Sequence, residues 1–173
     1  RTTLAQLRDQ LAGRPITLVI GSTAEILQAM SEDRIDTALY AGDTVGATVT
    51  HRLPVQWFGD PALAMAKVVP LVGITPPCPF LKAAQQALDG VGREWRMALV
   101  TPSLDGLRAA VQEGLGVTCR TTVGIGLMPL PIGYLPALPD ISYSVSERHR
   151  AKSEVGEIAR MLSQQLGTLT SGW

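Results

Sequence analysis

The apolar residues near the start of the chain alternate between helical spacing and strand-like runs. Residues 16–20 form a near-continuous apolar run rich in β-branched side chains, which is typical of a buried strand. Residues 35–40 predict a further short strand. Helices are predicted on either side of the first run, with apolar stripes of Leu4, Leu7 and Leu11 before it and of Ile26, Leu27 and Met30 after it. This order of helix, strand, helix and strand is typical of parallel α/β architecture.

The beginning of the second helix is marked by a capping sequence. Gly21 turns the chain out of the first strand, and Ser22 precedes Glu25 by three positions. In that spacing the serine hydroxyl accepts a hydrogen bond from the glutamate amide, while the carboxylate reaches back to the serine amide. We therefore expect the helix to begin directly after Ser22.

The middle of the chain repeats the alternation. Strands are predicted over 68–74, 95–100 and 117–119, and a helix over 80–88 that ends near Gly90. Ser103 is a good N-cap for another helix, and Asp105 suits the dipole of its first turn. This helix is expected to end at Gly114 and Gly116, with an inward stripe of Leu104, Leu107, Val111 and Leu115.

The remaining segments connect and complete two lobes. Residues 45–57 alternate in part, and we interpret them as a strand that crosses between the lobes. Residues 124–139 carry many prolines and glycines among apolar residues, which predicts an irregular segment containing a short edge strand. Residues 141–145 alternate as a strand does, and a final helix is expected from Ser153 with Val155, Ile158, Leu162 and Leu166 as its stripe.

Composition indicates a globular protein rather than a nucleic-acid-binding or membrane protein. Of the 173 residues, 46% are hydrophobic and 17% charged, and 15 Lys and Arg balance 15 Asp and Glu. A DNA-binding face needs clustered basic residues, and the densest basic stretch, 148–152, is short. The longest apolar runs are too short for a bilayer. We expect these residues to contact neither DNA nor membrane.

The chemistry-bearing side chains do not suggest an enzyme. The two cysteines, Cys78 and Cys119, lie far apart in the sequence and form no CxxC pair. Only two histidines, His51 and His149, could supplement them as ligands, so no zinc site is predicted. A reduced cytosolic chain is the simpler interpretation, with a structural disulfide as the alternative. No nucleophile lies beside a base in the sequence, and the Gly124-Ile125-Gly126 segment lacks a dinucleotide loop's third glycine. No cofactor, metal or catalytic residue is predicted.

Three stretches, in this order, resemble the effector-binding domain of LysR-type transcriptional regulators. Residues 21–23 (G-S-T) and 33–39 (D-R-I-D-T-A-L) are similar to the family's first-lobe pattern. Residues 103–118 (S-L-D-G-L-R-A-A-V-Q-E-G-L-G-V-T) resemble its more specific helix-strand signature, and residues 138–143 (L-P-D-I-S-Y) its closing pattern. The sequence around Trp95 and Cys119 is similar to that of the LrhA/HexA subgroup.

The resemblance implies an α/β fold of two Rossmann-like lobes joined by two crossing strands, as in type 2 periplasmic binding proteins. Lobe I is expected over residues 1–56 and 144–173, and lobe II over 57–143. The family's N-terminal winged helix-turn-helix is absent from this sequence. The first strand of lobe I is expected to be missing too, which would leave apolar edges of the sheet exposed.

The resemblance also implies an effector site in the cleft between the lobes, at the carboxyl ends of the strands. Thr23 and Cys78 with Phe80 match family positions that contact the effector, and Ser103 caps a helix that faces the cleft. Capping or core packing is the alternative role of each of these residues. The other candidates lie beside them or end a strand: Ser22, Tyr40, Pro77 and Cys119.

The function implied is the sensing of a small metabolite by a cytoplasmic regulator that forms a homodimer or tetramer. Effector binding would shift the population of lobe arrangements and so change how the absent domains meet DNA. The family pairs a first-lobe helix of one subunit with a second-lobe helix of the other, which here implicates residues 4–11 and 104–111. A stand-alone periplasmic-type solute-binding protein is the alternative, and the effector, target genes and direction of regulation are not indicated.

Overall fold

The structure is a computed structural model that describes residues 15, 17–44, 46–122, 125–148, 158, 161 and 164. The chain forms two compact units, residues 1–51 with 142–173 (unit 1) and residues 52–141 (unit 2). The lobe limits expected from the sequence stay a prediction. No helix within the described ranges combines the length and the apolar character needed to cross a membrane.

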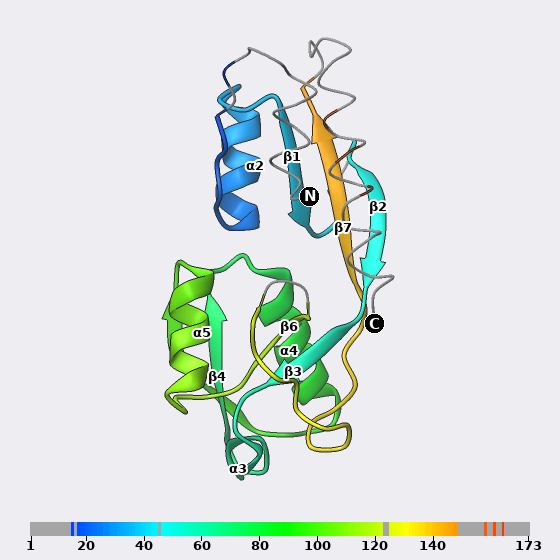
Figure 1. The fold of residues 1–173 in the computed structure, drawn as a ribbon. Helices are drawn as coiled ribbons and strands as arrows, with labels where there is room; N and C mark the ends of the chain where they lie inside the picture. Colours follow the sequence, from blue (N-terminus) through cyan, green and yellow to red (C-terminus); the bar gives the residue numbers. More distant parts are fainter. Residues whose placement is uncertain are drawn as a thin grey trace. The chain divides into compact units, whose positions relative to one another are not determined.

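Unit 1 is built on a three-stranded sheet. Its strands run in the order β1 (Thr37–Ala41), β7 (Ile141–Glu147) and β2 (Thr48–Leu53), with β1 antiparallel to β7. Helix α2 (Thr23–Ser31) lies beside β1 (Figure 1). A small core of Ile26, Ala38 and Tyr40 holds the helix to the strand, with Leu27 and Met30 partly buried against it.

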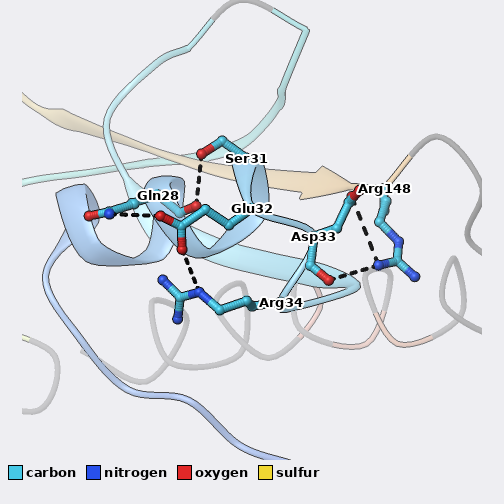
Figure 2. A network of polar contacts seen from close by, with 6 residues as sticks. All are labelled: Gln28, Ser31, Glu32, Asp33, Arg34 and Arg148. Carbon is cyan, nitrogen blue, oxygen red and sulfur yellow. Dashed lines mark hydrogen bonds and ion pairs between the residues drawn. The ribbon is translucent and has the colours of Figure 1, made fainter.

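A network of exposed polar side chains surrounds the turn between α2 and β1 (Figure 2). The Glu32 carboxylate accepts hydrogen bonds from Gln28 Nε2 at 2.8 Å and from Arg34 Nε at 2.6 Å. Arg148, which follows β7, donates to the Asp33 carbonyl at 2.9 Å and pairs with the Asp36 carboxylate at 3.0 Å. Exposed pairs contribute little to stability individually, so the network mainly positions the turn against the end of β7.

Unit 2 contains a sheet of parallel strands with one antiparallel neighbour. β4 (Val69–Ile74) is parallel to β5 (Trp95–Thr101), and β6 (Thr118–Thr121) is antiparallel to β3 (Val55–Phe58). A parallel bridge between Leu71 and Val117 joins the two pairs. The strand order is therefore β5-β4-β6-β3.

Two helices cover opposite faces of the unit 2 sheet (Figure 1). α4 (Pro79–Gly90) places Leu81 against Gly73, whereas α5 (Leu104–Gln112) packs Leu107 and Val111 against Val72 and Ile74. Neighbouring residues of a strand point to opposite faces, so these contacts place α4 on one side of β4 and α5 on the other. A short helix, α3 (Pro61–Ala64), precedes β4.

Gly114 and Gly116 of the 103–118 signature are each required for a different structural reason. Gly114 has a φ of +69° directly after α5, a conformation that a residue with a Cβ adopts only at a cost. A Cβ on Gly116 would lie 2.6 Å from the Pro70 carbonyl oxygen of β4. The chain can therefore turn out of α5 and enter the sheet beside β4 only with glycine at these positions.

Most predicted elements of the described residues are confirmed. α2 begins after Ser22 with both hydrogen bonds of the capping box, and α5 begins after Ser103. The edge strand predicted within residues 124–139 is not formed in the described residues, which show there only an isolated bridge between Phe58 and Pro129. The predicted elements that match observed ones are the helices at 80–88 and 103–115 and the strands at 35–40, 68–74, 95–100, 117–119 and 141–145.

Three predictions about these elements are wrong, and one element was not predicted. Residues 17–20 form no strand, and none of the described strands pairs with them. In place of the single crossing strand predicted over 45–57, residues 48–53 and 55–58 form two strands, β2 and β3, separated by Pro54. The short helix α3 was not predicted. Leu104 and Leu115 are 36% and 51% exposed, since one opens α5 and the other follows its end. The expected first helix lies outside the described residues, as does most of the last one.

Candidate functional site

The carboxyl ends of the parallel strands in unit 2 form the best-defined candidate site. β4 and β5 end together at Ile74 and Thr101, and the Thr75 amide donates to the Thr101 carbonyl at 3.0 Å. β6 runs in the same direction beside β4 and ends at Thr121. Because α4 and α5 begin just after this edge, their first-turn amides and the hydroxyls of the loops gather there.

Ser103 lies at this edge and caps α5. Its Oγ accepts a hydrogen bond from the Gly106 amide at 3.0 Å, and its own amide donates to Thr101 Oγ1 at 3.4 Å. A hydroxyl that accepts one hydrogen bond still has a proton to donate. Ser103 is exposed, so its hydroxyl can cap the helix and bind a ligand acceptor at once.

The loop before α4 contributes Pro77 and Cys78. Pro77 is exposed, and the half-buried Cys78 occupies the N-cap position of α4 without a side-chain hydrogen bond to the helix. The first-turn amides of α4 consequently lack the side-chain acceptor that Ser103 supplies to α5. The Cys78 side chain also packs partly against the core that includes Ile74 and Phe58.

Phe80 and Cys119 are in direct contact. Cys119 is 2% exposed, and its Sγ donates to the Phe80 carbonyl at 3.1 Å. Burial, with a smaller contribution from the nearby Cys78, raises the pKa of Cys119 to about 12. Both cysteines are free thiols. At neutral pH Cys119 is therefore an uncharged packing residue, with no solvent-facing group to offer a ligand.

Arg120 is a residue of this site that the sequence reasoning missed. Its guanidinium carbon lies 4.3 Å from the centre of the Phe80 ring, so the strand end and the start of α4 meet through a cation–π contact. Its signal in the sequence is a single charged residue within the 117–121 strand segment.

The candidates in unit 1 are largely occupied by internal hydrogen bonds. Ser22 Oγ donates to the Glu25 carboxylate at 2.8 Å, and Thr23 Oγ1 donates to the Ala41 carbonyl at 3.0 Å. The Tyr40 hydroxyl, 4% exposed as a residue, contacts the hydroxyls of Thr44 and Ser146. Thr23 retains a lone pair, whereas Ser22 and Tyr40 fit their capping and packing roles.

The charged network at the α2–β1 turn does not belong to these candidates. Thr23, at the start of α2, meets the carboxyl end of β1, whereas Glu32 and Asp33 follow the opposite end of the helix. Ser22 and Thr23 therefore lie together with Ala41 in unit 1, and Cys78, Phe80 and Cys119 lie together in unit 2. Ser103 joins the unit 2 group through the shared edge of β4 and β5.

Known proteins resemble this chain in both sequence and fold. The chain is 28% identical over 135 residues to the HTH-type transcriptional regulator PecT of Dickeya dadantii, covering 74% of this chain and 43% of that protein. It is also 28% identical over 142 residues to the regulator DgdR of Burkholderia cepacia, covering 80% and 48%. The chain thus spans less than half the length of these curated relatives.

Solved structures of LysR-type proteins share the fold at low sequence identity. HinK, a LysR family transcriptional regulator from Pseudomonas aeruginosa, matches with a TM-score of 0.68 and 17% identity over 96% of this chain and 65% of that one. The regulatory domain of CcmR from Synechocystis PCC6803, in complex with 2-PG, matches with a TM-score of 0.67 and 14% identity over 98% and 90%.

A family model decides between the two functions that the sequence left open. The LysR substrate binding domain matches residues 2–129, well over half of the chain, and the curated relatives are regulators rather than solute receptors. The LrhA/HexA-like subgroup stays a prediction. The α/β units, the helix-strand signature at 103–118 and the relatives agree: this chain belongs to the LysR substrate-binding domain family.

Proposed function

We propose that this chain is the effector-sensing part of a cytoplasmic DNA-binding transcriptional regulator, and that the strand ends of unit 2 bind the effector. The observation that carries the proposal is the shared edge of β4, β5 and β6, where two helices begin and Ser103 keeps a proton to donate. Hydrogen-bond donors at such an edge suit the oxygen atoms of a small metabolite. Catalysis and cofactor binding are not part of the proposal.

The contributions of the candidate residues differ in this proposal. Ser103 donates a hydrogen bond, the exposed Pro77 and half-buried Cys78 supply an apolar edge, and Phe80 with Cys119 supports that edge from the core. In unit 1, Thr23 offers a lone pair to a ligand donor while Ser22 and Tyr40 hold its surroundings in place. CcmR, which has the same fold, is known in complex with 2-PG, so we propose a small polar effector here.

The test uses the full-length regulator in a thermal-shift screen of metabolites that includes 2-PG, followed by calorimetric titration of the compounds that raise the melting temperature. Ser103→Gly removes the hydroxyl at a capping cost of only a few tenths of a kcal/mol. Asp60→Gly is the matched control, because Asp60 caps α3 at 2.7 Å before the amino end of β4. We expect S103G alone to weaken effector binding by about tenfold.

Two results would contradict this assignment. Equal effector affinity in the wild type and S103G would remove the unit 2 edge from the proposed site. A regulator whose binding to operator DNA responds to none of the stabilising compounds would contradict the sensing role itself. Thr23→Val, read in the same titration, tests the unit 1 residue separately.

We further propose that the protein works as a homodimer or tetramer. Leu18, Val19 and Ile20 are 60%, 44% and 87% exposed, and Leu104 is 36% exposed at the start of α5. Apolar side chains left in water favour association. Leu107 and Val111, by contrast, are buried in the core of unit 2, so Leu104 is the member of the expected second-lobe surface that stays accessible. Light scattering of Ile20→Glu and Leu104→Glu variants tests the proposal, which fails if both assemble as the wild type does.

A further inference from the structure

The guanidinium of Arg120 has hydrogen-bond donors that its contact with Phe80 does not satisfy. Arg120 is half buried at the end of β6, and its Cζ lies 4.3 Å from the centre of the Phe80 ring. A guanidinium carries five N–H donors, and an aromatic ring offers them no oxygen or nitrogen acceptor. The contact with Phe80 therefore leaves the hydrogen-bonding capacity of Arg120 largely unused.

None of the hydrogen bonds and ion pairs of the described residues supplies an acceptor to these N–H groups. The ion pairs among the described residues involve three other arginines, each with a carboxylate partner: Arg34, Arg108 and Arg148. Arg120 has neither an ion pair nor a side-chain hydrogen bond there; Gln56, its register partner on β3, is exposed. A half-buried guanidinium has lost part of its hydration, which makes an anionic partner favourable.

The surroundings of Arg120 also favour an anion. Phe80 lies in the first turn of α4, whose N-cap residue Cys78 supplies no side-chain acceptor. Ser103, at the same edge of the sheet, has a proton to donate. The acidic residue nearest in sequence to that edge, Asp105, is already paired with Arg108.

We propose that Arg120 is the anion-binding residue of the effector site and that it selects ligands carrying a carboxylate or phosphate group. The assignment rests on the proposed effector-binding role of unit 2 and adds a ligand class to it. The Phe80 ring lies 4.3 Å from the guanidinium carbon and limits where this group can go, and a guanidinium can donate two parallel hydrogen bonds to one oxyanion. A ligand without a negative charge would leave this cation half buried and without a partner.

The experiment measures binding of benzoate, inorganic phosphate and the uncharged benzamide to the full-length regulator by thermal shift and calorimetry. Arg120→Gln removes the charge, and Arg120→Lys keeps the charge without the planar fork. Arg96→Gln is the matched control, since Arg96 is an exposed arginine on β5, a strand of the same unit that does not adjoin β6. Melting curves without ligand establish that each variant is folded.

We expect benzoate or phosphate to stabilise the wild type and R96Q, benzamide to have no such effect, and R120Q to lose anion affinity by about tenfold or more. R120K should retain phosphate better than benzoate, because phosphate binding needs the bidentate geometry less. Equal anion binding by R120Q, or no stabilisation by either anion at millimolar concentration, overturns the assignment. If an uncharged metabolite regulates operator binding equally in wild type and R120Q, the Arg120 assignment falls while the sensing role stands.

Discussion

Gly106 in α5 provides a test of the packing that supports the Ser103 edge. Replacing a helical glycine with alanine ordinarily stabilises a protein by up to about 1 kcal/mol. At this position, however, a Cβ would lie 2.3 Å from Thr101 Oγ1 and 3.1 Å from Ser103 Oγ. Relieving such an overlap in a packed region costs about 1–3 kcal/mol. We therefore expect Gly106→Ala to lower the free energy of unfolding by about 1 kcal/mol, with the opposite sign to the usual effect.

The assay is urea denaturation followed by tryptophan fluorescence, which reports on unit 2 through Trp57 and Trp95. Gly90→Ala is the control, because Gly90 closes α4 and a Cβ there would meet nothing within 4 Å. Thr101→Ala removes the clashing oxygen, so the double variant with G106A should recover about 1 kcal/mol relative to the sum of the single changes. If G106A stabilises as much as G90A does, or if no coupling to Thr101 appears, the reasoning is refuted.

Three further predictions concern the core and two titrating groups. Leu107 is 1% exposed, so Leu107→Ala should lower the free energy of unfolding in urea by about 3 kcal/mol. Leu104 is 36% exposed, so Leu104→Ala should lower it by less than a third of that amount. Equal losses would contradict the placement of α5. The backbone and side-chain hydrogen bonds with Ser22 lower the pKa of Glu25 below its ordinary value of 4.5, so the capping box stabilises the fold fully above pH 4.5 and loses that contribution as the pH falls below it. Glu25→Gln should flatten this part of the acid-unfolding curve. Burial raises the pKa of Cys119 from 9.0 to about 12, so iodoacetamide should alkylate native protein at pH 8 only at Cys78. For the same reason the free energy of unfolding should fall as the pH rises above 9. Labelling of Cys119 in the native protein, read by mass spectrometry, would disprove its burial.

Local sequence signals predicted the described elements where one physical cause acts within a few residues. Ser22 with Glu25 and Ser103 with the Gly106 amide are contacts across three positions, so they form as soon as the helix does. Gly114 ends α5 for an equally local reason, its positive φ. Such features can be predicted from the sequence because the residue type and the local backbone conformation depend on each other.

Predictions failed where a residue's environment depends on distant partners. Residues 17–20 have the composition of a buried strand, yet a strand exists only where another strand accepts its hydrogen bonds, and none of the described residues does so. The i, i+3, i+7 spacing assigned Leu104 to the core, but the first residue of a helix lies at the edge of the sheet it covers. The hydroxyls of Thr44 and Ser146, the second of them 106 residues away, are hydrogen-bonded to Tyr40, and local sequence does not reveal such partners.

The sequence by itself determined the α/β class, the helix beginnings and the family, because capping residues, glycines and apolar periods act over short distances and recur in family order. Only the tertiary structure decided which polar groups have a partner and which retain a free hydrogen-bonding atom. Ser22 and Thr23 donate their hydroxyl protons within unit 1, and the Tyr40 hydroxyl is hydrogen-bonded to those of Thr44 and Ser146. Ser103 keeps a proton to donate, and the guanidinium of Arg120 lies over the Phe80 ring. Whether a donor is free depends on acceptors far away in the chain, and the fold alone brings these within 3 Å or keeps them apart.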